Sequence, residues 1–350
     1  MALTEVRDLR VRFVTRDATV HAVNGVSFTV QPGEVLCILG ESGSGKSVTL
    51  RALMRLLPPR RTRIEGKVSI DGQDVLAMRP QALRDLRGGL AAMIFQEPMT
   101  ALDPVYTVGQ QIGEVVRRHT GCGSRAARER ALELLGLVRI PSPERRLDAY
   151  PHELSGGLRQ RAMIAMALSC NPRLLLADEP TTALDATVQV QVLILLRRLQ
   201  RELGMGMIFV THDLGVAAEI ADTIAVMYAG RIVESGSVAQ ILSAPEHPYT
   251  AGLLASTVHG QPRDRDIDAI PGNPPDLRRL AQGCSFAPRC PRRMADCRVV
   301  VPQPRFPAPP AVWPRVMRSR TACRRQRSCA ASCRWPDTKV LGIRCRQIRW

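Results

Sequence analysis

Short apolar runs predict the strands of this chain. The runs 35–39, 174–177 and 207–210 are continuous and end in polar residues, which is typical of strands buried on both faces. Further strands are predicted at 6–13, 26–30, 66–70 and 91–95, with a late hairpin of 224–228 and 231–234 that turns at residues 229–230. Helical patterns separate most of these runs, among them 187–203, so we expect a mostly parallel sheet covered by helices.

The pattern changes between residues 98 and 157. Helical periodicity dominates there, at 108–119 and 125–137, with no β-branched run between the two. This stretch predicts a helical subdomain inserted into a core that contains the sheet. The predicted division of the chain is a core of 1–97 and 158–258, the helical subdomain 98–157, a C-terminal extension 259–304 and a tail 305–350.

Hydropathy places the chain among globular proteins. Of its 350 residues 45% are hydrophobic, and the mean hydropathy is −0.07. No apolar run approaches the roughly 18–20 residues that a membrane span needs. Residues 1–13 carry charges where a secretory signal needs an apolar block. We therefore expect the chain to stay in the cytoplasm and to reach a membrane only by docking on a partner.

The net charge of +17 invites a nucleic-acid interpretation, but its distribution argues against one. Residues 305–350 hold twelve Lys and Arg against one acidic residue, which is +11 of the +17. The body of the chain is thus only mildly basic. Aromatic residues make up 4% of the chain, and all three Trp lie in the tail, so no basic patch with interleaved aromatics is present. No nucleic-acid partner is expected.

Residues 40–47 read Gly-Glu-Ser-Gly-Ser-Gly-Lys-Ser and fit the phosphate-loop pattern, between a buried strand and a helix expected to run to residue 57. Glycines let backbone N–H groups approach the phosphates, and the helix N-terminus adds a favourable dipole. Lys46 suits the β- and γ-phosphates, and the Ser47 hydroxyl suits Mg²⁺. The expected ATP-binding residues of this segment are Gly40, Glu41, Ser42, Gly43, Ser44, Gly45, Lys46, Ser47 and Val48.

Polar residues follow three of the other predicted strands. Asp178 and Glu179 end the run 174–177, at the edge where open α/β sheets place ligands. We expect Asp178 to hold Mg²⁺ through water and Glu179 to act as general base on the attacking water. An acidic strand end is more often merely solvated, but about 130 residues after a phosphate loop the pair is a strong signal.

His212 and Gln96 occupy equivalent positions after neighbouring strands. Each would by default be an ordinary polar residue that opens a loop. Beside a phosphate loop, His212 is expected to contact a γ-phosphate, and Gln96 to reach Mg²⁺ or the attacking water.

Residues 154–161, Leu-Ser-Gly-Gly-Leu-Arg-Gln-Arg, resemble the signature of the ABC ATPases. The phosphate loop, Gln96, Asp178-Glu179, Ala183-Leu184-Asp185 and His212 follow the same family's order, so the chain is identified as a member over about residues 3–304. The resemblance implies an α/β fold: a phosphate-loop ATPase core with a mostly parallel sheet, an antiparallel β subdomain and an inserted helical subdomain.

The signature implies a second anion site. Ser155 and the amides of Gly156 and Gly157, at the start of a helix, suit a γ-phosphate. In the family that phosphate belongs to ATP held by the opposite subunit, so two ATP molecules join two subunits head to tail. Asp185 resembles the residue that communicates between the two sites, and Phe13 is the one candidate for the aromatic side chain that stacks on the adenine ring.

Finer features resemble one branch, the ATPases of oligopeptide, dipeptide and nickel importers. These features are the segments 95–109, 246–250, 270–275 and 283–291. The branch implies a peripheral subunit on the cytoplasmic face of the inner membrane, with a second ATPase subunit, identical or different, and two permease subunits. An extracellular solute-binding protein would act on it indirectly. The segment 96–109 is the expected contact with the permease.

Other functions fit the sequence less well. A nickel or other small-solute importer is the alternative within the branch. Soluble ABC ATPases that act on ribosomes or DNA usually carry two cassettes or a long coiled-coil insertion, whereas this chain has one phosphate loop and one signature. A regulatory subunit that binds ATP without hydrolysing it is disfavoured, because Glu179 and His212 are both present.

Seven of the ten cysteines lie between residues 284 and 345. A reducing compartment disfavours disulfides, and in some relatives this cysteine motif, completed by a fourth Cys, holds an iron–sulfur cluster. Cys284, Cys290 and Cys297 match the first three ligands, and Cys323 is the nearest candidate for the fourth, at a long spacing. The alternative is that these cysteines remain from a packing motif.

We expect the tail 305–350 to be disordered and dispensable, because its high charge and weak periodicity do not offset the entropy of ordering it. Truncation after Pro304 should leave the ATPase rate and the melting temperature unchanged. The assays are ATP hydrolysis, thermal melting and visible absorption for iron–sulfur colour. Loss of activity, a large fall in melting temperature, or loss of a colour that the full chain shows would make the tail structural, with Cys323 the first residue to mutate.

Overall fold

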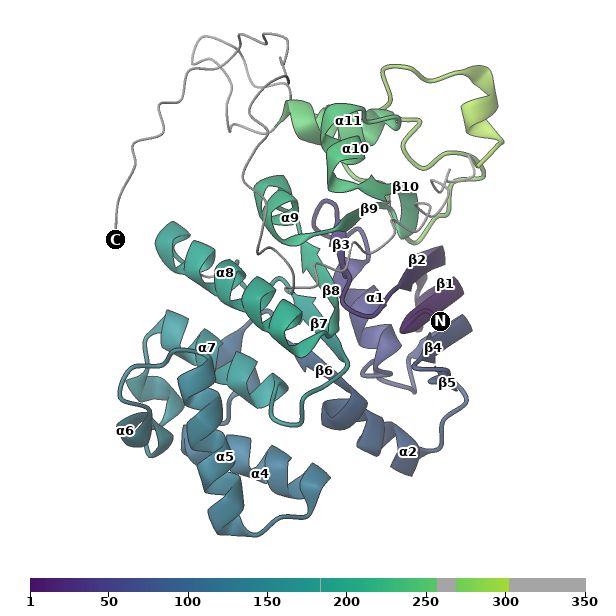
Figure 1. Ribbon diagram of the computed structural model, residues 1–350. Helices are drawn as coiled ribbons and strands as arrows, with labels where there is room; N and C mark the ends of the chain where they lie inside the picture. Colours follow the sequence, from purple (N-terminus) through teal and green to yellow (C-terminus); the bar gives the residue numbers. More distant parts are fainter. Residues whose placement is uncertain (183, 257–268, 302–350) are drawn as a thin grey trace, which may run out of the picture. The chain divides into compact units, whose positions relative to one another are not determined.

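Two sheets organise the part of the chain that the computed structural model describes, residues 1–182, 184–256 and 269–301 (Figure 1). Ala183, Cys323 and the predicted tail lie outside the described residues. One sheet has six strands in the order β10-β9-β3-β8-β7-β6, and the other has four in the order β2-β1-β4-β5. The strands are β1 (Thr4–Val14), β2 (Thr19–Val30), β3 (Val35–Leu39), β4 (Thr62–Ile70), β5 (Gln73–Asp74), β6 (Ala91–Ile94), β7 (Leu174–Asp178), β8 (Gly206–Thr211), β9 (Thr223–Tyr228) and β10 (Arg231–Ser237).

The six-stranded sheet is the predicted parallel one. β9, β3, β8, β7 and β6 pair in parallel, and β10 joins antiparallel through the predicted hairpin at residues 229–230. Every residue of β3, β7 and β8 is buried, as their continuous apolar runs require. The carboxyl ends of these three strands therefore meet at one edge of the sheet.

The four-stranded sheet is antiparallel throughout. Its apolar face packs on the six-stranded sheet and on helix α1 (Lys46–Leu53), in a core that includes Val6, Ile38, Leu50 and Ile70. A mostly parallel sheet, an antiparallel sheet and covering helices confirm the predicted fold class.

Helices cover the parallel sheet and fill the segment after β6 (Figure 1). Besides α1 they are α2 (Pro80–Asp85), α3 (Pro98–Ala101), α4 (Val108–Thr120), α5 (Ser124–Leu137), α6 (Pro143–Leu147), α7 (Gly156–Ala167), α8 (Ala186–Leu203), α9 (Leu214–Ile220), α10 (Val238–Ser243) and α11 (Pro248–Ala255). Short 3₁₀ turns occur at Pro151–Glu153 and Ala295–Arg298, and Leu86–Leu90 forms one irregular wide turn. No helix in the described ranges is long and apolar enough to cross a membrane.

The predicted end of α1 at residue 57 is wrong, because the helix stops at Leu53. The guanidinium of Arg87 donates hydrogen bonds to the carbonyls of Met54 and Arg55, at 2.9 and 2.7 Å, and Arg55 has a positive φ of 49°. The helix is closed locally, because the amides of Arg55 and Leu56 turn back to the carbonyls of Ala52 and Arg51, at 2.9 and 2.8 Å, and Arg87 binds the carbonyls beyond this end.

Candidate functional site

The phosphate loop joins β3 to α1 and packs closely on neighbouring backbone. A Cβ added to Gly40 would lie 2.1 Å from the carbonyl oxygen of Met227, and one added to Gly45 would lie 2.3 Å from that of Ala22. The Ser44 carbonyl also accepts a hydrogen bond from Gly230 at 2.8 Å, so the loop is fixed to the β9–β10 turn. Only glycine fits at the two close approaches.

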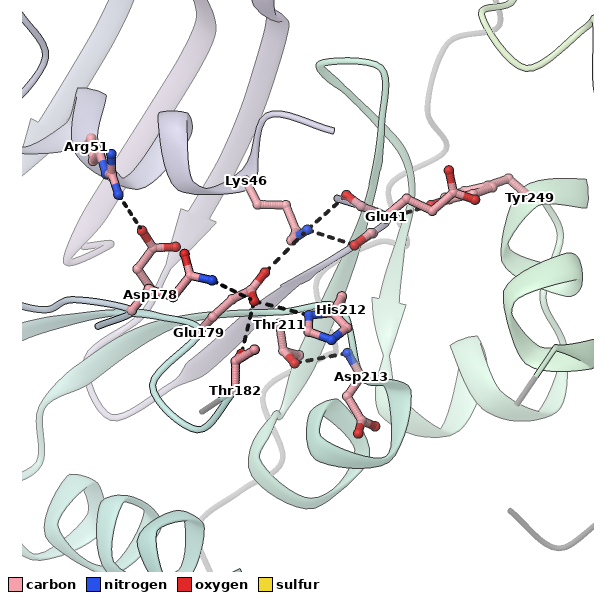
Figure 2. Close-up of polar contacts among 12 residues, drawn as sticks. Glu41, Lys46, Arg51, Asp178, Glu179, Thr182, Thr211, His212, Asp213 and Tyr249 are labelled. Atoms are coloured by element: carbon pink, nitrogen blue, oxygen red, sulfur yellow. Dashed lines mark hydrogen bonds and ion pairs between the residues drawn. The ribbon is translucent and has the colours of Figure 1, made fainter. Parts of the chain in front are cut away.

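Lys46 begins α1 and is only 4% exposed. Its Nζ donates to the carbonyls of Gly40 and Glu41 at 2.8 and 3.0 Å and lies 3.8 Å from the Glu179 carboxylate (Figure 2). Burial lowers the pKa of Lys46, and the nearby charge of Glu179 opposes that shift. The loop therefore holds a buried ammonium group at the edge where the parallel strands end.

The Glu179 carboxylate joins residues from three other segments (Figure 2). Its Oε2 accepts hydrogen bonds from Gln96 Nε2 at 3.4 Å and Thr182 Oγ1 at 3.0 Å, and lies 3.1 Å from His212 Nδ1. Glu179 itself has a φ of 45°, a conformation that is costly for a residue with a side chain and is found mostly at functional sites. The strained backbone directs this carboxylate at Lys46 and His212.

Thr182 was not among the predicted site residues. Its only signal in the sequence is a hydroxyl three residues after Glu179, which a local turn brings back to the carboxylate.

Asp178 ends β7 and is completely buried. Neither of its carboxylate oxygens accepts a hydrogen bond from the described residues, and the nearest cation, Arg51, lies 3.7 Å away. Burial raises the pKa of Asp178, and the Ser47 hydroxyl and Arg51 partly offset this. Buried carboxylate oxygens that lack hydrogen bonds and lie next to a hydroxyl are a donor set that Mg²⁺ accepts, directly or through water, so Ser47 and Asp178 fit the ion.

A cavity of about 790 Å³ opens between the phosphate loop and these groups. Of the predicted ligands in the loop, Gly40 and Ser44 are buried and do not line the cavity. Phe13 does line it, as expected for a residue beside the base, and so do Leu253 and Leu277, which were not predicted. The predicted residues on its wall are Phe13, Glu41, Ser42, Gly43, Gly45, Lys46, Ser47, Val48, Gln96, Glu179 and His212.

The signature residues do not line this cavity. Ser155 caps helix α7 by accepting a hydrogen bond from the Leu158 amide at 3.4 Å, and Asp185 caps α8 in the same way through Val188 at 3.0 Å. Gly157 packs on the Val188 side chain, and Gly156 lines a separate cavity of about 170 Å³ that includes Gln96. Within one chain, the phosphate loop and the signature are therefore distinct sites.

The structure does not support the iron–sulfur interpretation. Cys284, Cys290 and Cys297 are free thiols, and across the described segments no group of three or more potential ligands is gathered for a metal. Cys284 and Cys290 pack against the apolar core, and burial raises the pKa of the Cys284 thiol, which disfavours the thiolate that a cluster needs. Cys323 lies outside the described residues.

A strand–loop–helix anion cradle with a buried lysine, two carboxylates and a polarising histidine at the strand ends defines a phosphate-loop ATPase. The sequence pattern of the ABC transporter family matches residues 23–182, and that of the oligopeptide/dipeptide transporter C-terminal region matches residues 233–297.

Curated relatives extend the similarity over most of the chain. A peptide import ATP-binding protein of Brucella melitensis is 51% identical over 312 residues, which is 86% of this chain and 92% of the relative. The dipeptide transport ATP-binding protein DppD of Bacillus subtilis is 48% identical, over 85% of this chain and 89% of its own length. The oligopeptide transport ATP-binding protein OppD of Salmonella typhimurium is also 48% identical, over 87% and 90%.

A solved ATP-binding cassette, a dimer bound to ADP and phosphate, superposes with a TM-score of 0.61 at 29% identity, over 67% of this chain and 98% of that one. The chain belongs to the ATP-binding proteins of the ABC transporter family, and it is an ATPase.

The buried carboxylate of Asp178, which accepts no hydrogen bond from the described residues, generates a prediction for the protein without metal. Because burial raises its pKa, Asp178 contributes stability that is fully present below the unfolded pKa of 3.8 and is lost as the pH rises through the folded pKa. Asp178→Asn should therefore raise the melting temperature at pH 7 with a chelator and no nucleotide, and the gain should shrink towards pH 3.8.

With Mg²⁺ and ATP the sign should reverse, because the variant loses a ligand of the ion. Melting curves in both buffers measure the two effects. A variant less stable than the parent in chelator at pH 7 would contradict the prediction.

Proposed function

We propose that this chain energises a peptide importer by hydrolysing ATP between two ATPase subunits, on the cytoplasmic face of the inner membrane. The observation that carries the chemistry is the contact of one carboxylate, Glu179, with Lys46, Gln96 and His212 in a single cavity. The assignment to peptides is supported by the match of residues 233–297 to the oligopeptide/dipeptide transporter C-terminal region and by the relatives named for peptide import.

In this proposal each polar group has one task. Lys46 leaves the loop carbonyls and neutralises charge on the β- and γ-phosphate oxygens. Ser47, Asp178 and Gln96 would hold Mg²⁺, which would supply further neutralisation of the phosphate charge. Glu179 accepts a proton from the attacking water, and His212 fixes the orientation of Glu179 and contacts the γ-phosphate.

The second subunit completes the site. Ser155, Gly156 and Gly157 lie at the start of α7 and outside the cavity of their own chain, so their amides are available to an ATP held by a partner. Asp185, at the start of α8, adjoins the signature through Val188 and suits a link between the two sites. That two cassettes can pair is supported by the dimeric structures of related cassettes.

The permease contact is assigned to the segment 96–109 of the helical subdomain 98–157. Met99, Val105 and Tyr106 are 52%, 69% and 53% exposed there, an unusual concentration of large apolar side chains at a surface. Two permease subunits would bind such faces, and an extracellular solute-binding protein would act through them. We assign the core of 1–97 and 158–258 and the extension 259–304 to the ATPase itself.

Glu179→Gln should leave ATP binding intact and trap an ATP-bound dimer, because it removes the base and keeps the phosphate contacts. We expect hydrolysis to fall by roughly 10²–10⁴-fold, the usual contribution of a general base. Steady-state phosphate release and size-exclusion chromatography measure the two effects, with exposed Glu202→Gln as the matched control. A rate above about a tenth of the parent's would show that Glu179 is not the base.

Ser155→Arg should abolish hydrolysis with little effect on ATP binding by the monomer, since Ser155 serves the neighbour's nucleotide. A mixture with Lys46→Ala should leave at most one of the two composite sites intact. Nucleotide affinity of each purified monomer and activity of the mixture are the measurements. An equal loss of monomer affinity in both variants would argue against a site made between subunits.

A further inference from the structure

The C-terminal extension reaches the cavity of its own chain. Leu277 lines the cavity together with Phe13 and Val20, which face each other across the β1–β2 pair. The Leu277 carbonyl accepts a hydrogen bond from the His21 amide of β2 at 2.9 Å. The extension is therefore held on the side of the cavity that Phe13 marks as the place of the base.

A second contact joins the extension to the phosphate loop. The Arg289 guanidinium, in a residue only 8% exposed, donates to both carboxylate oxygens of Glu41, at 2.9 and 3.2 Å. It also donates to the carbonyls of Pro271 at 2.9 Å and Ile270 at 3.3 Å and to the Tyr228 hydroxyl at 3.4 Å. The bidentate contact of this buried guanidinium thus holds the extension and Glu41, the second residue of the loop, to each other.

The surroundings of this pair leave it little freedom. The Tyr249 hydroxyl accepts a hydrogen bond from the Glu41 amide at 2.9 Å (Figure 2). Tyr228 packs on Tyr249, with ring centroids 4.6 Å apart, and lies under the Arg289 guanidinium at 5.9 Å. The gap that Pro274 and Pro275 leave against the loop is only about 20 Å³, room for about one water molecule.

The pairing has an electrostatic consequence. Glu41 lies on the wall of the same cavity as Lys46, the proposed ligand of the triphosphate. The Glu41 side chain is 25% exposed. An uncompensated carboxylate there would repel the phosphates through a medium of reduced dielectric constant. Arg289 cancels this charge from behind the loop.

We propose that residues 269–301 form an integral wall of this chain's own ATP site, in which Leu277 contacts the nucleoside and Arg289 positions the phosphate loop through Glu41. The inference rests on ATP binding at Lys46, as proposed above. It makes the extension part of the nucleotide site rather than an appendage to the ATPase core.

The test compares the binding of Mg²⁺–ATP and of inorganic tripolyphosphate, which lacks a nucleoside, by titration calorimetry on the full chain. Leu277→Ala should weaken ATP binding about fivefold and leave tripolyphosphate binding unchanged, because only apolar contact with the nucleoside is lost. Leu280→Ala, in the same segment and 43% exposed, is the matched control and should change neither. Equal affinity of Leu277→Ala and the parent for ATP would overturn the role of Leu277.

Arg289→Met should weaken both ligands about tenfold, because Glu41 then lies unpaired beside the phosphates. Adding Glu41→Gln should restore most of the loss, a rescue that a purely structural role of Arg289 would not give. Arg278→Met is the control, since exposed Arg278 pairs with its neighbour Asp276. Unchanged affinity in Arg289→Met, or absence of rescue, would overturn the role of Arg289.

If Arg289→Met fails to fold in a thermal melt, Arg289→Lys carries the test: it keeps a charge beside Glu41 but loses the bidentate contact, and should weaken both ligands less than tenfold. Affinities equal to the parent's would again overturn the role. Lys46→Ala separates the two proposals. If it binds ATP as the parent does, the nucleotide site itself is wrong; if it fails while the Leu277 and Arg289 variants bind normally, only the inference about the extension is wrong.

Discussion

A lysine ammonium buried at the end of a parallel sheet constrains the rest of this molecule. Lys46 has 4% of its surface exposed, and burying such a charge is costly unless carbonyls and carboxylates surround it. The loop carbonyls of Gly40 and Glu41 provide one part of that environment. The carboxylate of Glu179, which directly follows β7, provides the other. These contacts require β3 and β7 to end at the same edge, which the parallel order around β8 ensures.

The same constraint accounts for two costly local features. Glu179 takes a positive φ, and Asp178 keeps both carboxylate oxygens without hydrogen bonds. Neither would persist in a structure selected for stability alone. In the proposed mechanism a divalent cation would give the Asp178 oxygens partners, and the binding of a triphosphate would offset the backbone strain at Glu179.

The phosphate loop is held in place by the β9–β10 turn and by residues nearer the C-terminus. The β9–β10 turn fixes Ser44, and Tyr249 and Arg289 fix Glu41. A family whose ATPase core is shared by many transporters can thus add a segment after that core and still place it against the reacting groups. The match of residues 233–297 to a branch-specific C-terminal region fits this arrangement.

The sequence by itself determined the strands of the six-stranded sheet and most of the candidate site, whereas it predicted only part of β2 and β4 and missed β5. β3 was predicted with its observed bounds because a strand buried on both faces needs a continuous apolar run. The residues from Gly40 to Val48 could be predicted as a unit, because a phosphate site made of consecutive backbone amides depends only on a short stretch of sequence. Gln96, Asp178, Glu179 and His212 were found because each follows a strand of one sheet.

Only the tertiary structure decided the contacts between distant segments. Arg87 binds the carbonyls of Met54 and Arg55, Leu277 lines the cavity, and Arg289 binds Glu41 on the wall of that cavity. Likewise the separation of Ser155 from the cavity of its own chain cannot be read from its motif. A motif specifies what a few neighbouring groups can bind, whereas which distant side chain meets them depends on how the whole chain packs.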